Sequence, residues 1–554
     1  FSQKALVRRL RSIESLGATT VICTDKTGTL TQNKMTVTQL RTTDLLESDI
    51  DSNAIWSPHS WSPTYTRLCE VMNYCNNATL PNVGDPTEIA LLAFVAQIAI
   101  GGFVRYNEIP FNSQSKYMIV SGLQWWNQHI SYIKWSLEYM LELCQWYQQK
   151  DIVIPLTAKE KDRILAQNNH YATQAIRVLG CWYSLNTASS DSIPQFIFVG
   201  MVGMIDPPRP EVSKAIQDCY WAWMKVIMIT GDHLATAQAI AYQIGLKGNA
   251  IQWIDFQQSS SQLDILKDTT IFARVSPEQK VIICEWLQKL GHHVVMTGDG
   301  VNDAAALKAA DIGFSMGITG TQVTKDASDI VLLDDNFATI VATIAQGRTV
   351  YDNIKKFIVF MLAVNFDEMI RVVVSFIIGI PVPMTAIQIL RINLVTDSFP
   401  ALWLGFDRGD GDVMSQKPRD PKQGILQWQR FIIIIASILA SALGIGLFIY
   451  NLQTEWLEIA RTVSVTAAVF FEMMVIYSFR HPTKQAWQLP TNRFLNWSVI
   501  GVLCFHTLTL YMPWWKYFDF VPLSWEDLWL CFMTGMIWWI VFEWWKWIKK
   551  KTSN

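Results

Sequence analysis

The stretch VICTDKTGTLTQNKMTV, residues 21–37, places a carboxylate at the end of a short apolar run. The run Val-Ile-Cys-Thr predicts a short buried β-strand, and it is followed directly by Asp25, Lys26, Thr27 and Gly28. An aspartate in this place is suited to attack on phosphorus, because aspartate carboxylates form covalent acyl phosphates. The hydroxyl and open N–H groups beside it suit phosphoryl oxygens. One such loop is weak evidence, since Asp and Thr are common turn residues.

Two more acidic loops follow strand-like runs, VIMITGDH at 226–233 and HVVMTGDGVNDAAAL at 293–307. Apolar runs with little alternation are typical of parallel strands buried on both faces, and helix-like segments separate them. The sequence therefore predicts a doubly wound α/β sheet whose strand ends form a crevice. We expect four carboxylates to converge there: Asp25, Asp232, Asp299 and Asp303. Clustered carboxylates repel one another without a cation, so a Mg²⁺ site is predicted, with Thr230 and Gly231 offering groups for phosphoryl oxygens.

Composition excludes several classes of protein. Half of the 554 residues are hydrophobic, 17% are charged, and the net charge is −2. These values exclude a disordered chain and a basic nucleic-acid-binding protein, so no nucleic-acid partner is expected. The nine cysteines include no C-x-x-C pair, which argues against a zinc site or a disulfide framework.

Six apolar stretches follow Lys356, and we expect each to cross a membrane. They are 357–380, 384–405, 431–450, 462–479, 495–511 and 525–541. Buried core helices are the alternative, but six in succession oppose it. Basic residues collect before the first stretch, in alternate loops and after the last, so the positive-inside rule predicts a cytoplasmic head and C-terminus.

Oxygen-bearing side chains interrupt three of these stretches: Asn365, Glu368, Asn393, Thr396, Asp397 and Glu472. Ionisable residues inside a span are costly and are therefore functional candidates. Oxygen donors without Cys or His suit Ca²⁺ rather than a soft metal, although Mn²⁺ prefers similar ligands. The alternative is that some acids pair with basic neighbours such as Arg371. Pro400 is able to break the second span and free backbone carbonyls.

At this point the sequence resembles the P-type cation-transporting ATPases, within them the calcium-pump branch. Besides DKTGTLT, the matching stretches are GDPTEIALL at 84–92, DPPRPEV at 206–212, ARVSPEQK at 273–280 and the run 334–357. The resemblance implies a haloacid-dehalogenase-like phosphorylation domain with an inserted nucleotide-binding domain and six transmembrane helices. It also implies ATP-driven cation transport through an aspartyl phosphate. The implied boundaries are 1–39 and 196–350 for the phosphorylation domain, 40–195 for the nucleotide-binding domain and 351–554 for the membrane domain.

The resemblance also implies roles for individual residues. Asp25 is the residue phosphorylated by ATP, with Lys26 beside it, and Lys280 resembles the lysine that grips the transferred group. The residues implied to bind Mg²⁺ and phosphate are Asp25, Thr27 and Asp299, supported by Asn302 and Asp303. The ATP-binding residues are implied to be Glu88, Phe111, Lys116, Lys134, Arg177, Thr230, Gly231, Asp232 and Arg274. The six intramembrane residues named above match the Ca²⁺ site of sarcoplasmic-reticulum-type pumps.

The chain also departs from the family pattern. It resembles the C-terminal part of a pump, so we expect four earlier helices and an actuator domain to precede Phe1 and to act as its partner. A non-catalytic remnant, a membrane-anchored phosphatase, or a pump for Na⁺ or Mn²⁺ are the alternatives. Three local differences bear on function. Trp135 is able to fill the adenine site. Asp367 adds a carboxylate that raises a neighbour's pKa or demands a further cation. Arg391 lies near the outer end of its span, where its charged end is able to snorkel to the membrane interface.

Overall fold

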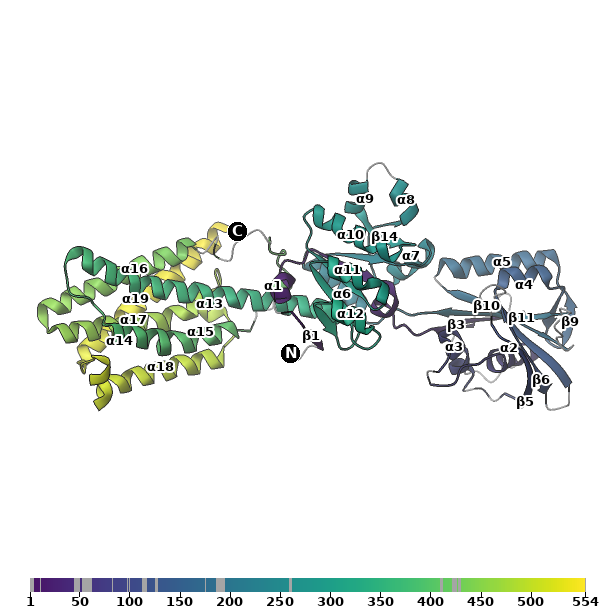
Figure 1. Cartoon of the computed structure of the whole chain (residues 1–554), viewed down its shortest axis with the longest axis horizontal. Coiled ribbons are helices and arrows are strands. Elements are labelled where there is room, and N and C mark those ends of the chain that lie inside the picture. The colour runs from purple at the N-terminus through teal and green to yellow at the C-terminus, as the bar shows by residue number, and fades with distance from the viewer. Residues whose placement is uncertain are drawn as a thin grey trace. The chain divides into compact units, whose positions relative to one another are not determined.

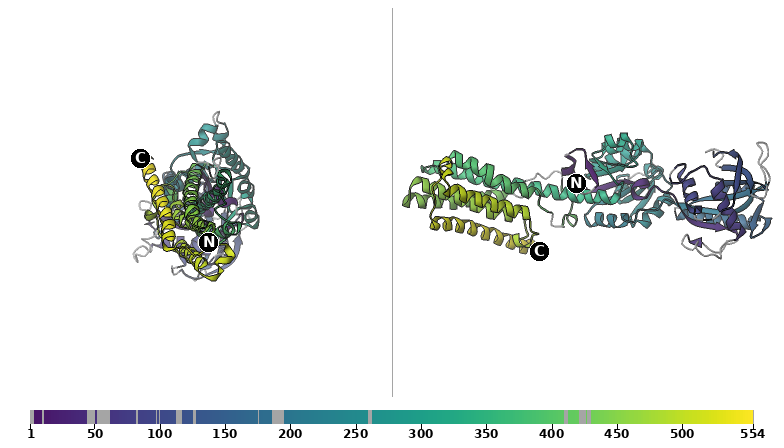
Figure 2. Two further views of the ribbon diagram at one scale, coloured as in Figure 1. Left: turned by 90° about the vertical axis from the view of Figure 1, so that its left-hand side faces the viewer. Right: turned by 90° about the horizontal axis from the view of Figure 1, so that it is seen from below.

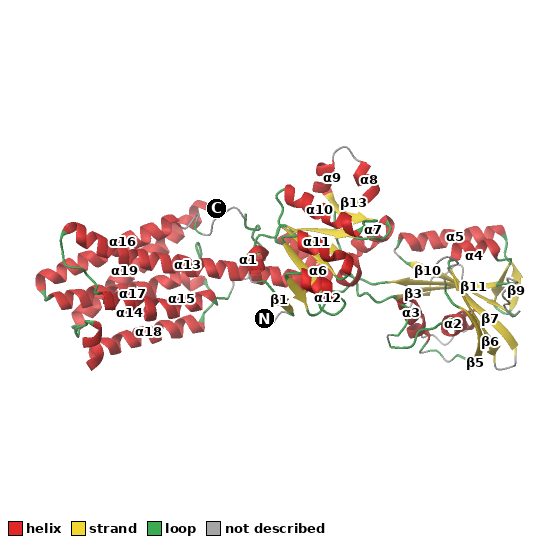
Figure 3. Ribbon diagram, viewed as in Figure 1, coloured by secondary structure: helices red, strands yellow, loops and turns green. Residues whose placement is uncertain are grey.

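The computed structural model describes two compact units. The described residues are 4–9, 11–43, 50–51, 62–81, 83–96, 98, 100–111, 117–124, 128–174, 176–185, 195–258, 262–408, 412–420, 426 and 430–553. The first unit is formed mainly by 20–220 and 224–341, and the second by 342–554 together with two short segments, 9–19 and 221–223. Figure 3 shows that the strands belong to the first unit and that the second is helical.

An eight-stranded sheet carries the three acidic loops. Its order is β1-β17-β16-β15-β2-β12-β14-β13. All its neighbours are parallel except β1 and β17, which confirms the doubly wound α/β prediction. The strands are β1 (Ala5–Val7), β2 (Val21–Asp25), β12 (Lys225–Ile229), β13 (Asn249–Gln252), β14 (Thr269–Ala273), β15 (Val294–Gly298), β16 (Ile312–Met316) and β17 (Ile330–Leu332).

The three strands that precede the acidic loops are neighbours in this sheet, because β2 lies between β15 and β12. Cys23 of β2 faces Met296 on one side and Ile227 on the other, and all three side chains are buried. Parallel neighbours end at one edge, so their loops meet there. The helices of this sheet are α6 (Val212–Trp221), α7 (Leu234–Gln243), α8 (Trp253–Gln258), α9 (Gln262–Asp268), α10 (Pro277–Lys289), α11 (Ala304–Ala309) and α12 (Gln322–Ala327).

A second, nine-stranded sheet is inserted between β2 and β12, and its main path is β4-β3-β11-β10-β7-β6-β5. These strands are β3 (Thr36–Thr42), β4 (Ile50–Asp51), β5 (Phe103–Ile109), β6 (Tyr117–Gln124), β7 (Gln128–Trp135), β10 (Arg177–Ser184) and β11 (Ile197–Ile205), with β8 (Trp146–Gln149) and β9 (Ile152–Pro155) off the path. The expected boundary at 39/40 cuts β3, and that at 195/196 leaves β11 outside the inserted domain. The nine-stranded sheet thus runs from β3 to β11, and the domain boundaries themselves stay a prediction, because an apolar run such as β11 does not reveal which sheet it joins.

Helices cover both faces of the nine-stranded sheet. Figure 1 shows α4 (Leu137–Leu143) and α5 (Ala158–Thr173) on one side, with α2 (Pro63–Tyr74) and α3 (Pro86–Val95) on the other. Two separate buried clusters follow from this arrangement, one under α2 and α3 and one under α4 and α5. Successive residues of a strand point to opposite faces, so neighbours along β7 belong to different clusters.

The second unit is a bundle of helices that run side by side, as both views of Figure 2 show. It contains α1 (Arg11–Leu16), most of α13 (Phe337–Ile378), α14 (Ala386–Arg391), α15 (Ser398–Gly405), α16 (Arg430–Thr454), α17 (Leu457–Phe479), α18 (Arg493–Tyr511) and α19 (Trp525–Ser553). Among the described helices, four are long and apolar enough to cross a membrane: α16, α17, α18 and α19. They correspond to the last four of the six predicted spans. The first two stay predictions, since α13 carries ionisable residues and the next segment is divided.

The second predicted span is divided by a widened, π-helical turn, Ile392–Asp397, between α14 and α15. Pro400 lies one turn later and has no N–H for the carbonyl of Thr396, which is a physical cause of the widening. The hydroxyl of Ser398 donates to the carbonyl of Asn393 at 2.8 Å and so uses another backbone oxygen of this turn. The interruption lies just before Pro400, close to where the sequence placed it.

Candidate active site and cation site

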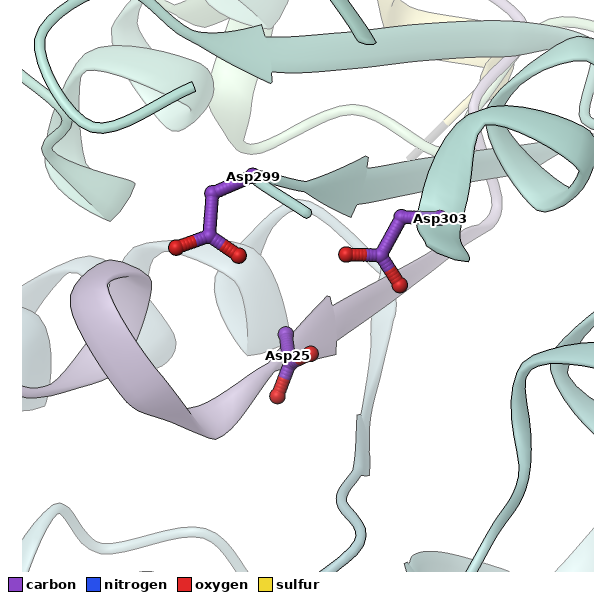
Figure 4. A group of neighbouring side chains, drawn as sticks. All are labelled: Asp25, Asp299 and Asp303. Atoms are coloured by element: carbon purple, nitrogen blue, oxygen red, sulfur yellow. The ribbon is translucent and has the colours of Figure 1, made fainter. Parts of the chain in front are cut away.

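Three carboxylates meet at the edge of the eight-stranded sheet: Asp25, Asp299 and Asp303, here called the acidic trio. Their ligand oxygens all lie within 4.8 Å of one another. Figure 4 shows Asp25 at the tip of β2, Asp299 directly after β15, and Asp303 just before α11, at the end of the short helical turn Val301–Asp303. The predicted convergence is therefore present for the loop after β2 and the loop after β15, which together contribute these three carboxylates.

Lys280 of α10 neutralises part of this charge. Its Nζ lies 2.5 Å from Oδ2 of Asp25 and 2.8 Å from Oδ1 of Asp303. Burial lowers the pKa of this lysine, but Asp25 and Asp303 outweigh that effect and raise the pKa above its usual value. Burial and the charges of Asp25 and Asp303 likewise raise the pKa of Asp299. The lysine is thus held charged in contact with the nucleophile candidate.

The main chain fixes the direction of Asp25. The N–H of Lys26 donates to Oδ1 of Asp25 at 2.6 Å, and the N–H of Asp25 donates to Oγ1 of Thr297 at 3.3 Å. Gly28 has φ +74°, a backbone conformation that favours glycine, and it lies against the carboxylate of Asp299. Thr27 lies exposed beside this loop. The loop thus offers the exposed hydroxyl of Thr27 two residues after Asp25.

The loop after β12 is held to the same region by an ion pair. Nζ of Lys26 lies 2.6 Å from Oδ2 of Asp232, so Asp232 pairs with a lysine and is not part of the acidic trio. Thr230 is buried, and its hydroxyl accepts a hydrogen bond from the N–H of Asp232 at 3.1 Å. Gly231 and Arg274 are exposed, and the N–H of Arg274 donates to the carbonyl of Asp232 at 3.0 Å. Asn302 is exposed in the loop after β15.

Two of the proposed nucleotide residues contact each other on the nine-stranded sheet. Lys134 of β7 forms an ion pair with Glu88 of α3, and both side chains are largely buried. Phe111 is 58% exposed and Arg177 is exposed, as suits residues that contact a ligand. Lys116 lies outside the described residues. The contact between Glu88 and Lys134 identifies one face of the sheet, the face covered by α2 and α3.

Trp135 lies on the other face. Its side chain is 5% exposed, packs in the cluster under α4 and α5, and has its ring centroid 4.2 Å from that of Tyr117. The expectation that its indole fills a site beside Lys134 is therefore wrong. The physical reason is the alternation of strand residues, which turns Trp135 away from the neighbouring lysine.

Five of the six oxygen-bearing residues of the helices form a group, here called the membrane cluster, in which all but the half-buried Asn393 are buried: Glu368, Asn393, Thr396, Asp397 and Glu472. The amide of Asn393 donates to Oε2 of Glu368 at 2.8 Å, and the carboxyl groups of Asp397 and Glu472 interact electrostatically. Six oxygens have no hydrogen-bond partner among the described residues, namely Oε1 of Glu368, Oγ1 of Thr396, both of Asp397 and both of Glu472. Buried oxygens of this kind require a ligand or protons. Asn365 is exposed, and its amide donates to the carbonyl of Met361 at 2.7 Å.

Asp367 does not add a free carboxylate to this cluster. Arg371 binds it through two nitrogens, at 3.0 Å and 2.8 Å, and both side chains are buried. Asp367 thus follows the alternative in which an acid pairs with Arg371, and it needs no further cation, because this arginine one turn away supplies the charge. The sequence predicts that Arg391 snorkels, but its side chain is only 4% exposed. Its Nη2 lies 2.9 Å from Nδ1 of His506, and its guanidinium lies over the rings of Phe505 and Phe520.

Comparison with known proteins agrees with this geometry. Three family descriptions match the chain: "P-type ATPase, cytoplasmic domain N" over 64–211, "haloacid dehalogenase-like hydrolase" over 146–311 and "Cation transporting ATPase, C-terminus" over 381–548. The chain belongs to the P-type cation ATPases. Two of these matches fall on the two sheets and the third on the helical bundle, so the family relation extends to both units.

Individual P-type ATPases resemble the chain over most of its length. Calcium-transporting ATPase 1 of Bacillus cereus is 37% identical over 90% of this chain and 60% of the relative. Calcium-transporting ATPase of Bacillus subtilis is 35% identical, covering 92% and 62%, and human calcium-transporting ATPase type 2C member 1 is 35% identical, covering 92% and 58%. The chain thus spans about three fifths of the length of these relatives.

Several residues of this P-type ATPase that fix the Asp25 loop by hydrogen bonds were not predicted from the sequence. Thr297 accepts the N–H of Asp25, and Arg209 donates to the carbonyls of Thr31 and Gly28. The hydroxyl of Thr31 in turn donates to Asp206 at 2.5 Å. The matching stretch DPPRPEV contains two of these residues, but their contacts lie nearly 180 residues away in sequence and no local pattern reveals them.

Proposed function

We propose that the whole protein uses ATP to move Ca²⁺ across a membrane through an acyl phosphate on Asp25. The observation that carries the proposal is the contact of Lys280 with Asp25 inside the acidic trio, at the end of a buried parallel strand. The three relatives described above are all named calcium-transporting ATPases, which supports the choice of ion. We assign the eight-stranded sheet to the phosphorylation domain, the nine-stranded sheet to the nucleotide-binding domain and the helical bundle to the membrane domain.

Asp25 is proposed as the nucleophile. A carboxylate oxygen of Asp25 forms a bond to the γ-phosphorus of ATP, and the bond from that phosphorus to the β–γ bridging oxygen breaks, which releases ADP. Lys280 lies against the same carboxylate and is placed to contact the transferred phosphoryl oxygens. Lys26, paired with Asp232, holds the first two loops together. Phosphoryl transfer depends mainly on such positioning and charge neutralisation.

Mg²⁺ fits the acidic trio by the chemistry of its donors, since hard cations take carboxylate and hydroxyl oxygens. Asp25, Thr27 and Asp299 are the proposed holders, supported by Asn302 and Asp303. When bound, the ion supplies positive charge beside the transferred phosphoryl group.

ATP is proposed to bind the inserted domain on the face that carries the contact between Glu88 and Lys134. Phe111 is exposed and available for stacking on the base, and Arg177 is exposed and available for phosphate oxygens. Lys116 completes the proposed set. Thr230, Gly231, Asp232 and Arg274 border the crevice on the side of the acidic trio.

The membrane cluster is the proposed Ca²⁺ site, together with Asn365. Six buried oxygens of this cluster, contributed by α13, the widened turn and α17, have no hydrogen-bond partner among the described residues, which supports a bound cation. Backbone oxygens freed near Pro400 are further candidate ligands. Oxygen donors also suit Mn²⁺, so a series of cations is part of the test.

Labelling with radioactive ATP and radioactive acetyl phosphate tests the chemistry. Acetyl phosphate needs the acidic trio and not the nucleotide site. We expect label from both donors in the wild type, none in Asp25→Asn, and unchanged label in Asp264→Asn, whose side chain is exposed on α9. Label that survives in Asp25→Asn would place the acceptor elsewhere and overturn the assignment.

Equilibrium binding of radioactive Ca²⁺ to the full-length protein tests the ion site. Glu472 and Glu458 both lie on α17, the first buried and the second exposed. Glu472→Gln should weaken Ca²⁺ binding at least tenfold, the effect of about 1.4 kcal/mol. Glu458→Gln should bind as the wild type does. Equal loss in both variants, or stronger binding of Na⁺ than of Ca²⁺, would contradict a Ca²⁺ site here.

A further inference from the structure

Two neighbouring cavities lie in the helical unit where the apolar part of α13 begins. One has a volume of about 190 Å³ and lies among α13, the ends of α17 and α19, and the segment 412–416. The other has about 210 Å³ and lies between α13 and the segment 413–419. They share four lining residues: Asp352, Lys355, Val413 and Gln416. We call the two together the basic pocket.

The lining of the basic pocket is strongly positive. Its cationic residues are Arg348, Lys355, Lys356, Lys417, Arg419 and Lys546, against two acids, Asp352 and Asp412. One of those acids is already engaged, because Asp412 pairs with Lys484 outside the pocket. An excess of lining cations around a hollow raises the local concentration of anions.

Some of these cations have structural partners and others remain available. Lys356 lies 3.5 Å from Asp407, and Lys546 lies 2.9 Å from Glu543, so both hold helices together. Lys355 has neither a hydrogen bond nor an ion pair with any described residue. Nζ of Lys417 lies 4.7 Å from the ring centre of Trp223, an interaction that leaves its charge in place. Lys355 and Lys417 are therefore the best placed to meet an anion.

Part of the lining of the first cavity, the one of about 190 Å³, is apolar and aromatic and is formed by Val359, Phe479, Phe542 and Trp545. Lys355 and Lys356 immediately precede the first predicted span, and α17 ends at Phe479. The pocket therefore lies where apolar helices give way to basic residues, at the level of the headgroups of the cytoplasmic leaflet. Basic residues that serve only to orient helices in the membrane do not need a cavity between them. Here the basic residues line two cavities.

We propose that the basic pocket binds the phosphate of an anionic phospholipid from the cytoplasmic leaflet. Lys355 and Lys417 contact the phosphate or the headgroup carboxylate, and the lipid chains continue along Val359 and Phe542. Basic pockets between helices on the cytoplasmic side suit such headgroups, at about fivefold in affinity for each lysine. The binding is independent of the phosphoryl chemistry at Asp25 and of the membrane cluster.

Native mass spectrometry of the chain in detergent, with added short-chain phosphatidylserine or phosphatidylcholine, tests the proposal. We expect phosphatidylserine to bind the wild type more tightly, and Lys355→Gln/Lys417→Gln to lose about 10- to 30-fold in that affinity. Lys516→Gln, which changes a lysine of a different loop, should bind as the wild type does. Lys355→Arg/Lys417→Arg keeps the charges and should also bind normally, which separates lost charge from misfolding.

Equal phosphatidylserine affinity in the Gln double variant and in Lys516→Gln would overturn the proposal. A second arm adds inorganic phosphate without lipid. Phosphate that binds the wild type in detergent and displaces phosphatidylserine completely would assign the pocket to a soluble anion, and would equally overturn the lipid assignment.

Discussion

Arg371 and Asp367 form a two-bond ion pair inside the helical unit, at 3.0 Å and 2.8 Å, one turn apart on α13. The hydroxyl of Ser441 on α16 donates to the same carboxylate at 2.7 Å, and Arg371 donates to the carbonyl of Ser464 on α17 at 3.2 Å. Gly444 leaves room for the guanidinium, because a Cβ there would lie 2.4 Å from its carbon atom. The pair thus joins three helices and leaves Glu368 as the acid of α13 that faces Asn393.

Removing one member of this pair should be far worse than removing both. Arg371→Leu leaves a buried carboxylate without a cation, at a cost of about 3–5 kcal/mol, whereas the loss of both charges is often close to neutral. We therefore expect a large drop in the melting temperature of Arg371→Leu in detergent and substantial recovery in Asp367→Asn/Arg371→Leu. The control is Arg493→Leu, at an exposed arginine of α18. A double variant as unstable as the single one would show that the pair is not what holds the helices.

Replacing Lys280 should make the eight-stranded sheet depend on an added cation. Lys280→Met leaves three clustered carboxylates without the ammonium group that lies 2.5 Å from Asp25 and 2.8 Å from Asp303. Like charges at this distance destabilise the fold. We expect a lower melting temperature in chelator, a larger rise on addition of Mg²⁺ than in the wild type, and loss of labelling from acetyl phosphate by at least 100-fold. Identical Mg²⁺ effects in the two proteins would contradict the role given to Lys280. Lys289→Met, on the same helix, is the control.

Asp299→Asn should stabilise the metal-free protein while it weakens phosphorylation. Burial and the charges of Asp25 and Asp303 raise the pKa of Asp299 in the folded state. A carboxyl that holds its proton more tightly when folded makes the fold lose stability as pH rises from the ordinary aspartate value through the raised one. Above that range the penalty is constant, and the asparagine variant escapes it. We expect a gain of roughly 0.5–2 kcal/mol in chelator at neutral pH, and none below the ordinary pKa of aspartate. Melting curves across pH test this, and a gain that persists in acid would refute the electrostatic cause.

Trp135 should matter for folding and not for nucleotide affinity. Its side chain is 5% exposed under α4 and α5, so Trp135→Ala should cost about 3–5 kcal/mol. Trp135→Phe keeps most of the packing and is the variant for binding measurements. Fluorescent ATP analogues should bind it as they bind the wild type, whereas Glu88→Gln should weaken them. Tighter binding in Trp135→Phe would show that the indole does obstruct the nucleotide after all.

The convergence of two acids of the trio was predictable because each stands at the end of its strand. Asp25 and Asp299 come immediately after apolar runs, and parallel strands end at one edge, so sequence order alone brings them together. The same reasoning did not exclude Asp232 from the trio. Its partner, Lys26, stands next to Asp25 in the sequence. A lysine side chain is long enough to reach several acids, however, and the strand pattern does not predict which acid it pairs with.

Features that depend on pairing between distant segments were harder to predict from the sequence. The apolar run of β11 suits either sheet, and only its pairing with β3 and β10 assigns it to the inserted one. Burial of Arg391 depends on His506, which lies 115 residues away. A pattern of small residues on α16, Ser437, Ser441 and Gly444, does indicate a face in close contact with another helix. It was the available signal for the Arg371 pair.

Lys280 also bears on how the protein is made. A cluster of acids that needed a metal to assemble would leave a newly synthesised chain waiting for that metal, and chelation would unfold it. Here an ammonium group from α10 already lies among the carboxylates when the sheet closes. We therefore expect the fold of this domain to form without a metal ion. Under the proposed function, Mg²⁺ would then enter with each turnover as a reagent that comes and goes, rather than as a building block that must be installed once.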